Sequence, residues 1–233
     1  MPGGLSDWPV GPEALAIEQE RVAALVDEPW RPGREVSVGG CWVCFPRGAT
    51  GPGAAGDAAW TAAVELRGGR VVDRVVREGR AGAPYLPGLL ALRTGRLLEE
   101  AVGSLGTPPD VLLVDATGRD HPRRAGLARH LGAVLDVPTV GVTHRPLAAR
   151  GEWPPDERGA STPLLLDGEV VGCWLRTRPG TRPLAVHPGW RTTVETATRV
   201  VLGSTGQRRT PEPLRRARQL ARRARGGQPP ASR

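Results

Sequence analysis

The clearest candidate for a catalytic or binding residue in this sequence is an aspartate that is followed closely by a basic segment. Asp115 follows the apolar run VLLV (111–114), and His121, Arg123 and Arg124 come soon after it. A carboxylate beside arginines suits divalent-metal phosphoryl chemistry, because Mg²⁺ takes carboxylate and phosphate oxygens and Arg binds phosphate with two hydrogen bonds. The same residues fit a second interpretation, in which Asp115 caps a helix and the arginines form surface ion pairs.

A stiff loop holds the only tyrosine of the chain. Tyr85 lies in APYLPG (83–88), between Pro84 and Pro87, which restrict the backbone. A rigid aromatic side chain can wedge between two bases, since the insertion costs roughly a few kcal/mol of unstacking. The alternative is a packing contact through which Tyr85 anchors the loop.

The three cysteines predict buried thiols. Cys41 and Cys44 form a C-x-x-C within a predicted strand, where residues three apart point to opposite faces, so we expect neither a disulfide nor a zinc site.

The sequence shows no secretory signal and no apolar run near the roughly 18 residues of a membrane span. We therefore expect a cytoplasmic protein without membrane association.

The net charge of +8 is concentrated in the last part of the chain. Residues 204–233 contain nine Arg and the single acid Glu212, whereas residues 1–203 carry 23 basic and 23 acidic side chains. Such a tail attracts a polyanion, or it is only a solvated C-terminus. We expect one domain over 1–203, followed by an Arg-rich extension that is partly helical and ends in a disordered segment.

The elements that must position these residues follow from periodicity and turn residues. We expect helices over 12–28, 123–136, 192–203 and 211–225, a loop followed by a helix within 83–106, and strands over 35–45, 59–67, 70–78, 109–116, 137–143 and 182–189, with a further hairpin over 163–177. This order predicts an α/β fold with one mixed sheet, an antiparallel meander of three strands plus parallel strands, and helices on both faces. Asp115 would then lie at the carboxyl end of a central strand, where open α/β sheets place their chemistry.

Over about residues 16–213 the chain resembles the endonuclease V family, because it contains four of the family's motifs in the family's order. They are PYLPG (84–88), the long motif over 115–132, DVPTVGV (136–142) and PLAVHPGWR (183–191). The matching positions of the long motif are Asp115, Gly118, His121, Pro122, Arg123, Gly126, Ala128, His130 and Gly132.

The resemblance implies a ribonuclease H-like fold and a metal-dependent nuclease that uses Mg²⁺ or Mn²⁺ and recognises deoxyinosine in DNA or inosine in RNA. Tyr85 would be the aromatic of a strand-separating wedge. The nucleic-acid contacts that we expect come from Pro84, Tyr85, Pro87, Gly88, Gly118, His121, Arg123 and Arg124.

The chain departs from the family at the expected catalytic positions. Trp42 stands where the first strand should end in a metal-binding Asp, and Thr94 stands where the helix after the wedge should carry a Glu. His144 replaces a Lys, and Trp190 replaces a His in the late motif. Of three acidic metal ligands, only Asp115 remains.

This loss has a direct chemical consequence. An indole has one N–H donor and no acceptor, so Trp42 cannot bind a metal, and one carboxylate with waters holds Mg²⁺ weakly. We expect Trp42 and Trp190 to pack against each other and fill the former metal site. Asp120 and Glu195 are the acids that could rebuild a metal site with Asp115.

Three hypotheses follow. The first is an inosine-binding protein of the DNA-repair type, a monomer that binds DNA or RNA and has lost or weakened its metal-dependent cleavage. The second is an active Mg²⁺-dependent deoxyinosine endonuclease with an altered ligand set. The third is a scaffold or interaction protein, in which Asp115 is a cap, Pro122 starts a helix and His130 is a hydrogen-bonded core residue.

Overall fold

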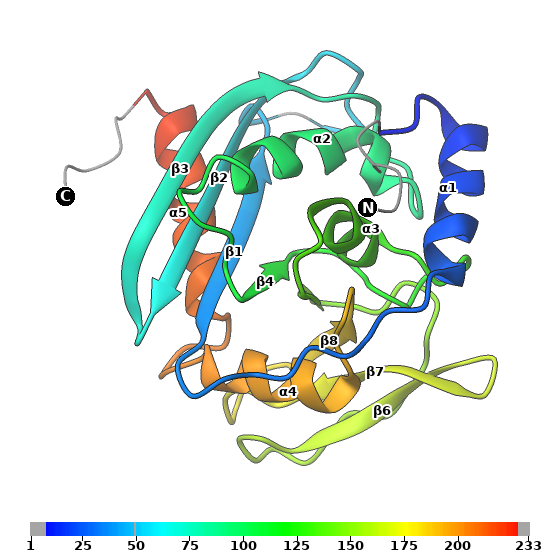
Figure 1. The fold of residues 1–233 in the computed structure, drawn as a ribbon, viewed down its shortest axis with the longest axis vertical. Helices are drawn as coiled ribbons and strands as arrows, with labels where there is room; N and C mark the ends of the chain where they lie inside the picture. Colours follow the sequence, from blue (N-terminus) through cyan, green and yellow to red (C-terminus); the bar gives the residue numbers. More distant parts are fainter. Residues whose placement is uncertain (1–7, 49, 228–233) are drawn as a thin grey trace.

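The computed structural model describes residues 8–48 and 50–227. The strands are β1 (Ser37–Cys44), β2 (Ala58–Arg67), β3 (Arg70–Arg80), β4 (Val111–Val114), β5 (Thr139–Thr143), β6 (Ser161–Leu166), β7 (Glu169–Leu175) and β8 (Leu184–Pro188). The helices are α1 (Pro12–Ala24), α2 (Leu90–Val102), α3 (Leu127–Leu135), α4 (Val194–Gly203) and α5 (Glu212–Arg225) (Figure 1). Over the described residues, none of these helices has both the length and the apolar character needed to cross a membrane.

The strands form one mixed sheet in the order β3-β2-β1-β4-β5-β8-β7-β6. Neighbours β1, β4 and β5 run parallel, whereas β1 to β3 form an antiparallel meander and β8 runs antiparallel to β5. This arrangement confirms the predicted mixed α/β sheet. Because β1 and β4 are parallel and in register at Cys41 and Val114, the residues after them emerge at the same end of the strands, which we call the carboxyl edge of the sheet.

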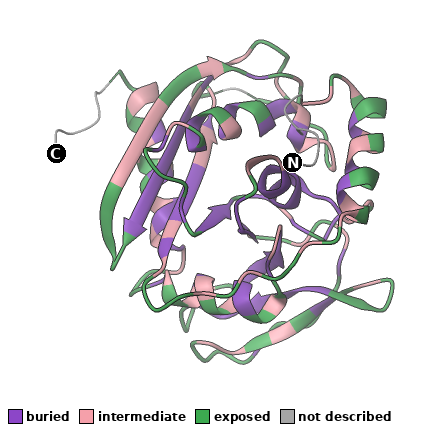
Figure 2. Cartoon of the chain, in the orientation of Figure 1, coloured by how far each residue is buried: buried purple, intermediate pink, exposed green. Residues whose placement is uncertain are grey.

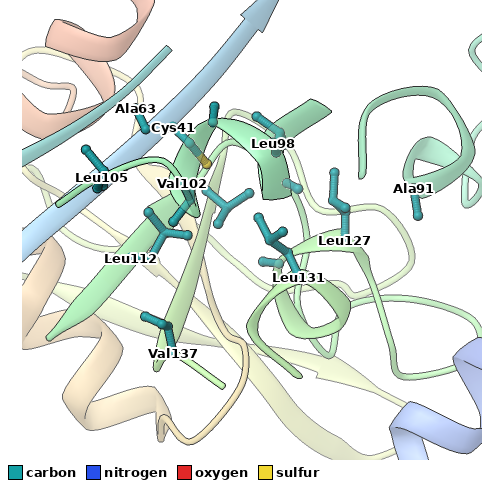
Figure 3. Packing of buried hydrophobic residues seen from close by; sticks show 14 of the residues in the cluster. Cys41, Ala63, Ala91, Leu98, Val102, Leu105, Leu112, Leu127, Leu131 and Val137 are labelled. Carbon is teal, nitrogen blue, oxygen red and sulfur yellow. The ribbon is translucent and has the colours of Figure 1, made fainter. Parts of the chain in front are cut away.

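The central strands are buried on both faces, as their apolar runs predicted. In β4, Leu112 and Val114 pack with α2 and α3, while Val111 and Leu113 pack with α4 and the start of α5. Figure 3 shows the first of these clusters, to which Cys41, Leu112 and Leu131 all belong. The edge strands β3 and β6 carry more exposed residues than the centre (Figure 2).

Both predicted tight hairpins are confirmed. Gly68 and Gly69 join β2 to β3 with φ values of +55° and +77°, and Asp167 and Gly168 join β6 to β7 with φ values of +52° and +81°. Two successive positive φ angles define the type I′ turn, whose twist matches that of a hairpin.

Helix α1 and the segment after it bury only some of their apolar residues. Ile17 and Val26 are 69% and 97% exposed, whereas the buried stripe consists of Leu15, Gln19 and Val22. These three residues have the i, i+4, i+7 spacing of one helix face. Helix α1 also ends at Ala24, short of the predicted residue 28.

Helix α3 begins later than the predicted residue 123. It starts at Leu127, because Arg124 adopts a left-handed conformation with φ +56° and Gly126 donates its N–H to the Gly118 carbonyl at 2.8 Å. The segment between β4 and α3 is therefore a closed loop that returns to the sheet edge.

Helix α5 covers the sheet over β1 and β2, on the opposite side from α2 (Figure 1). Leu214, Ala217 and Ala221 are buried against these strands. A Cβ on Gly40 would lie 2.4 Å from the carbonyl carbon of Pro213, so the start of the helix sits directly on the β1 backbone. Much of the expected Arg-rich extension is thus a packed helix, and the end expected to be disordered falls partly in residues 228–233, outside the described residues.

The three cysteines are free and buried. Cys41 belongs to the cluster beneath α2 and α3, whereas Cys44 packs with Ala221 of α5. The two thiols therefore lie on opposite faces of β1, as the strand geometry predicted.

Candidate functional site

Two adjoining recesses open at the carboxyl edge of β1 and β4. Recess A has a volume of about 440 Å³ and recess B about 400 Å³. Both are lined by Tyr85, Leu90, Asp115 and Leu127. Recess A is completed by residues that include Trp42, Phe45, Arg93 and Thr94, and recess B by residues that include Gly88, His121, Thr143 and His144. Together they form a cleft at the place that the sequence predicted for Asp115.

Asp115 lies directly after β4, where both recesses meet. Its side chain is exposed at the mouth of the recesses, but the protein atoms around it still displace part of its hydration shell. This desolvation raises the pKa of Asp115 to about 6, against the smaller opposing effect of the Arg218 charge. The carboxyl group is thus set apart chemically from an ordinary surface aspartate.

Trp42 and Trp190 do not pack against each other, so that prediction is wrong. Trp42 lines recess A and packs against the cluster of Cys44, Ala62 and Ala221, with the Arg218 guanidinium 5.5 Å from its ring centroid. Trp190 lies at the opposite edge of the sheet, where its Nε1 donates to Asp136 Oδ1 at 3.1 Å. The reason is the direction of β8, which runs antiparallel to β5 and carries Trp190 away from the cleft.

The other two departures from the family lie in the cleft. Thr94 is buried in α2, where its hydroxyl donates to the Leu90 carbonyl at 3.2 Å. His144 follows β5, and its Nδ1 accepts a hydrogen bond from Arg209 Nη1 at 3.0 Å. Partial burial, together with the charges of Arg209 and Arg218, lowers the pKa of His144. Neither position supplies a carboxylate to Asp115.

The two acids expected to rebuild a metal site do not join Asp115. Asp120 is fully buried, and its oxygens accept the N–H groups of Leu147, Ala148 and Ala149 at 2.6 to 2.8 Å. Glu195 is exposed in the first turn of α4, which begins at the opposite edge of the sheet.

The described part of the chain holds no group of three or more His, Cys, Asp or Glu residues that could bind a metal ion. Mg²⁺ requires oxygen ligands in near-octahedral arrangement. The cleft offers one carboxylate, and the nearby Arg218 charge opposes a cation. The residues present therefore do not fit a divalent-metal centre.

The predicted wedge loop (83–88) places Tyr85 between the two recesses and is held by hydrogen bonds to other parts of the chain. Tyr85 is 48% exposed, and its N–H donates to the Pro52 carbonyl at 2.7 Å. The buried Arg93 donates to the Ala83 carbonyl at 2.6 Å, forms an ion pair with Asp57 and lies over the Phe45 ring. Pro84 and Pro87 are exposed beside the ring. These contacts therefore hold the loop that carries the exposed Tyr85 ring.

The floor of recess B is a hydrogen-bonded unit. Gly88 has φ +78°, and its carbonyl accepts from His121 Nε2 at 2.9 Å and from Gln19 Nε2 at 3.1 Å. His121 Nδ1 accepts the Arg123 N–H at 3.1 Å, which places the proton of the ring on Nε2. Burial lowers the pKa of His121, so the imidazole is neutral. Gly118 has a structural role, since a Cβ there would lie 2.1 Å from the Pro188 carbonyl oxygen.

The two arginines after His121 point to different partners. Arg123 donates to Gln19 Oε1 at 3.3 Å, beside recess B. Arg124 donates to the Leu166 carbonyl and to Asp167, both at 3.1 Å, and so binds the β6–β7 hairpin. Neither side chain lines the recesses, and Arg124 does not face the cleft.

Four residues of the site were not predicted from the sequence. Arg93 and Gln19 support the wedge loop and the floor, and Arg209 and Arg218 place positive charge beside His144 and Asp115. A polar residue in the apolar stripe of a helix was the available signal for Gln19. Arg93, Arg209 and Arg218 gave no local signal, because their roles depend on contacts across the sheet.

Comparisons with known proteins agree with the motifs. The family model of endonuclease V matches residues 26–219. Endonuclease V of a Roseiflexus species is 39% identical over 218 residues, which cover 92% of this chain and 93% of that protein. The crystal structure of endonuclease V from Streptomyces avermitilis has a TM-score of 0.83 at 34% identity, and covers 96% of this chain and 97% of that chain.

A third similar structure is that of a protein–DNA complex. The crystal structure of Ciona intestinalis endonuclease V with a 24mer DNA containing an inosine followed by a ribo-adenosine has a TM-score of 0.74. It is 22% identical, and covers 91% of this chain and 96% of that chain. At this identity the likeness shows the fold alone.

Proposed function

The chain belongs to the endonuclease V family, and from this we propose that it binds nucleic acid at deoxyinosine or inosine, with lost or weakened phosphodiester cleavage. Its fold is the ribonuclease H-like α/β fold of that family. The observation that carries the proposal is a cleft that combines an exposed aromatic on a braced loop, Tyr85, with an adjoining recess of about 400 Å³, but that holds a single carboxylate. Three unpaired thiols fit a cytoplasmic location.

The support for binding comes from Tyr85 and recess B. An exposed aromatic on a braced loop offers a stacking surface, and stacking of one base on an aromatic contributes about 1–3 kcal/mol. Recess B, at about 400 Å³, lies next to this ring and is within the size range of small-ligand pockets. Its floor is formed by Gly88 and His121, whose hydrogen bonds to each other, to Gln19 and to Arg123 keep the recess in a fixed shape for a displaced base. The Ciona intestinalis relative, solved with inosine-containing DNA, supports this use of the fold.

The support for weakened cleavage comes from recess A. The endonuclease V family is generally metal-dependent, and phosphodiester cleavage of this kind needs several carboxylates to hold the cation. Here Trp42 and Thr94 stand beside Asp115 in place of acids, and Arg218 adds positive charge. The binding half of the family's site is therefore better preserved than its catalytic half.

One experiment separates binding from cutting. Purified protein, Asp115→Ala and Tyr85→Ala would each be incubated with a labelled oligonucleotide containing one deoxyinosine, or one inosine, and with Mg²⁺ or Mn²⁺. Each mixture is divided between a cleavage gel and a native binding gel, with a guanine-containing oligonucleotide as the control.

We expect inosine-selective binding that depends on Tyr85, with little or no cutting. Cutting at a rate typical of an endonuclease that disappears in Asp115→Ala would overturn the loss of catalysis. Absence of both cutting and selective binding would overturn the proposed function and leave a scaffold role.

A further inference from the structure

Helix α5 contributes most of a concave surface that is lined almost entirely by arginine. We call this surface, about 740 Å³ in volume, the arginine basin. Its arginines are Arg47, Arg208, Arg215, Arg218, Arg222, Arg223 and Arg225. Arg47 comes from the segment after β1, so the surface is assembled from separate parts of the chain. An ordinary solvated helix would mix both signs of charge, and no acid lines this basin within the described residues.

The basin opens at the same edge of the sheet as the cleft. Helix α5 starts on Gly40 near the middle of β1, and at its far end Arg225 Nη1 donates to the Phe45 carbonyl at 3.0 Å, directly after β1. Phe45 also lines recess A. Arg218 belongs to the basin and acts on both Asp115 and His144 of the cleft. The two surfaces are therefore neighbours that share a boundary.

Local stability of the helix explains only part of this charge. Glu212 pairs with Arg215 at 2.5 Å and with Arg216 at 2.6 Å, and basic residues in the last turn favour the helix dipole. Arg208, Arg222 and Arg223 are exposed and form no ion pair with an acid of the described chain. Their mutual repulsion disfavours the compact state, which points to an external anion as their partner.

We propose that the arginine basin binds the phosphodiester backbone of the strand that leaves the cleft. This deepens the proposed function, on which it rests, by assigning base recognition to the cleft and sequence-independent affinity to α5. From Arg215 to Arg225 the helix rises about 15 Å. That length matches about four phosphates at the roughly 3.4 Å rise of one strand.

The test compares two triple variants that remove the same charge. The basin variant is Arg208→Gln, Arg222→Gln and Arg223→Gln. The matched control is Arg31→Gln, Arg34→Gln and Arg70→Gln, three exposed arginines at the opposite edge of the sheet. Dissociation constants are measured over a range of salt concentrations for single-stranded oligonucleotides of about 16 nucleotides, with and without one deoxyinosine. Thermal unfolding of both variants checks that the fold is retained.

We expect the basin variant to bind both oligonucleotides at least about tenfold more weakly at about 0.1 M salt, with a salt slope lower by about 2, since each lost phosphate contact on a single strand removes about 0.7. The ratio between the two oligonucleotides should not change. The control variant should keep both affinity and slope. An unchanged salt slope in the basin variant, or an equal loss of affinity in both variants, would contradict the proposal that the arginine basin binds the phosphodiester backbone. A wild-type protein without preference for deoxyinosine would instead overturn the proposed function, while the slopes still decide on the basin.

Discussion

Asp115 is the residue through which the cleft responds to pH. Its carboxyl group lies where two recesses meet, and the loss of water there keeps it protonated to a higher pH than an ordinary aspartate. The two histidines that line recess B have pKa values below the ordinary 6.5, so they are neutral where Asp115 becomes charged near neutral pH. Asp115 is therefore the group that lines the cleft and gains a negative charge as the pH rises, beside the permanent positive charges of Arg93 and Arg145.

Replacing Asp115 by Asn should stabilise the protein at about pH 8. The folded pKa of about 6 lies above the ordinary 3.8, so the stability contributed by this group is complete below 3.8 and is lost as the pH rises through about 6. The gain of the variant should therefore shrink as the pH falls towards about 4. Urea unfolding of both proteins at the two pH values measures the difference. Equal stabilities at about pH 8 would contradict a raised pKa.

Replacing Tyr85 by Ala should weaken the binding of inosine-containing strands while the fold is kept. The ring is 48% exposed, so little burial is lost, but a stacking contact worth about 1–3 kcal/mol disappears, a loss of about 5- to 150-fold in affinity. Native gels with inosine-containing and guanine-containing oligonucleotides measure this. Leu86→Ala, at a neighbouring residue that is 44% exposed, is the control. An equal loss in both variants would assign the effect to the loop as a whole.

The elements around the cleft show which parts of the fold follow from local sequence. The buried runs of β4 and β5, and the turns Gly68-Gly69 and Asp167-Gly168, obey short-range rules and were predicted correctly. The start of α3 was not, because a hydrogen bond between Gly126 and Gly118 closes the loop before it.

The same limit applies to the candidate site. The position of Asp115 followed from the end of a buried strand, and the wedge loop from its two prolines. The placement of Trp190 and Glu195 depends on the direction of β8, which no local pattern determines. The role of Asp120 as the acceptor for a distant loop depends likewise on a long-range contact.

Replacing Asp120 by Ala should loosen the segment that follows His144. The buried carboxylate accepts three backbone N–H groups from residues 147–149, and its removal leaves these donors without partners. We expect a loss of about 3 kcal/mol or more in the free energy of unfolding. Faster amide hydrogen exchange should be confined to this segment under native conditions. Asp167→Asn, at a side chain that is 79% exposed and at a turn position with φ +52° that Asn tolerates, should change neither quantity by a comparable amount.

At the scale of the whole molecule, α5 belongs to the sheet as much as to the C-terminal region. Its apolar stripe of Leu214, Ala217 and Ala221 covers β1 and β2, while its other side forms the arginine basin. One helix thus completes the core and provides charge beside the cleft. The family model also continues into this helix, to residue 219.

Truncation of the chain after residue 203 should therefore destabilise the fold. Without α5, the apolar faces of β1 and β2 are exposed to water, at a cost of about 25 cal/mol for each Å² of apolar surface. We expect aggregation or loss of cooperative thermal unfolding. A chain that ends at residue 227 keeps α5 whole, serves as the control and should still unfold cooperatively. A soluble, cooperatively folded 1–203 fragment would show that the domain ends before α5.

The burial of all three cysteines has a practical consequence. In the folded state a maleimide fluorophore should find no accessible native thiol, so a cysteine introduced at exposed Leu86 would be labelled selectively. A dye at that position lies beside Tyr85 and would report directly on strand entry into the cleft. Binding and release could then be followed in real time on a protein that keeps all its own side chains but one.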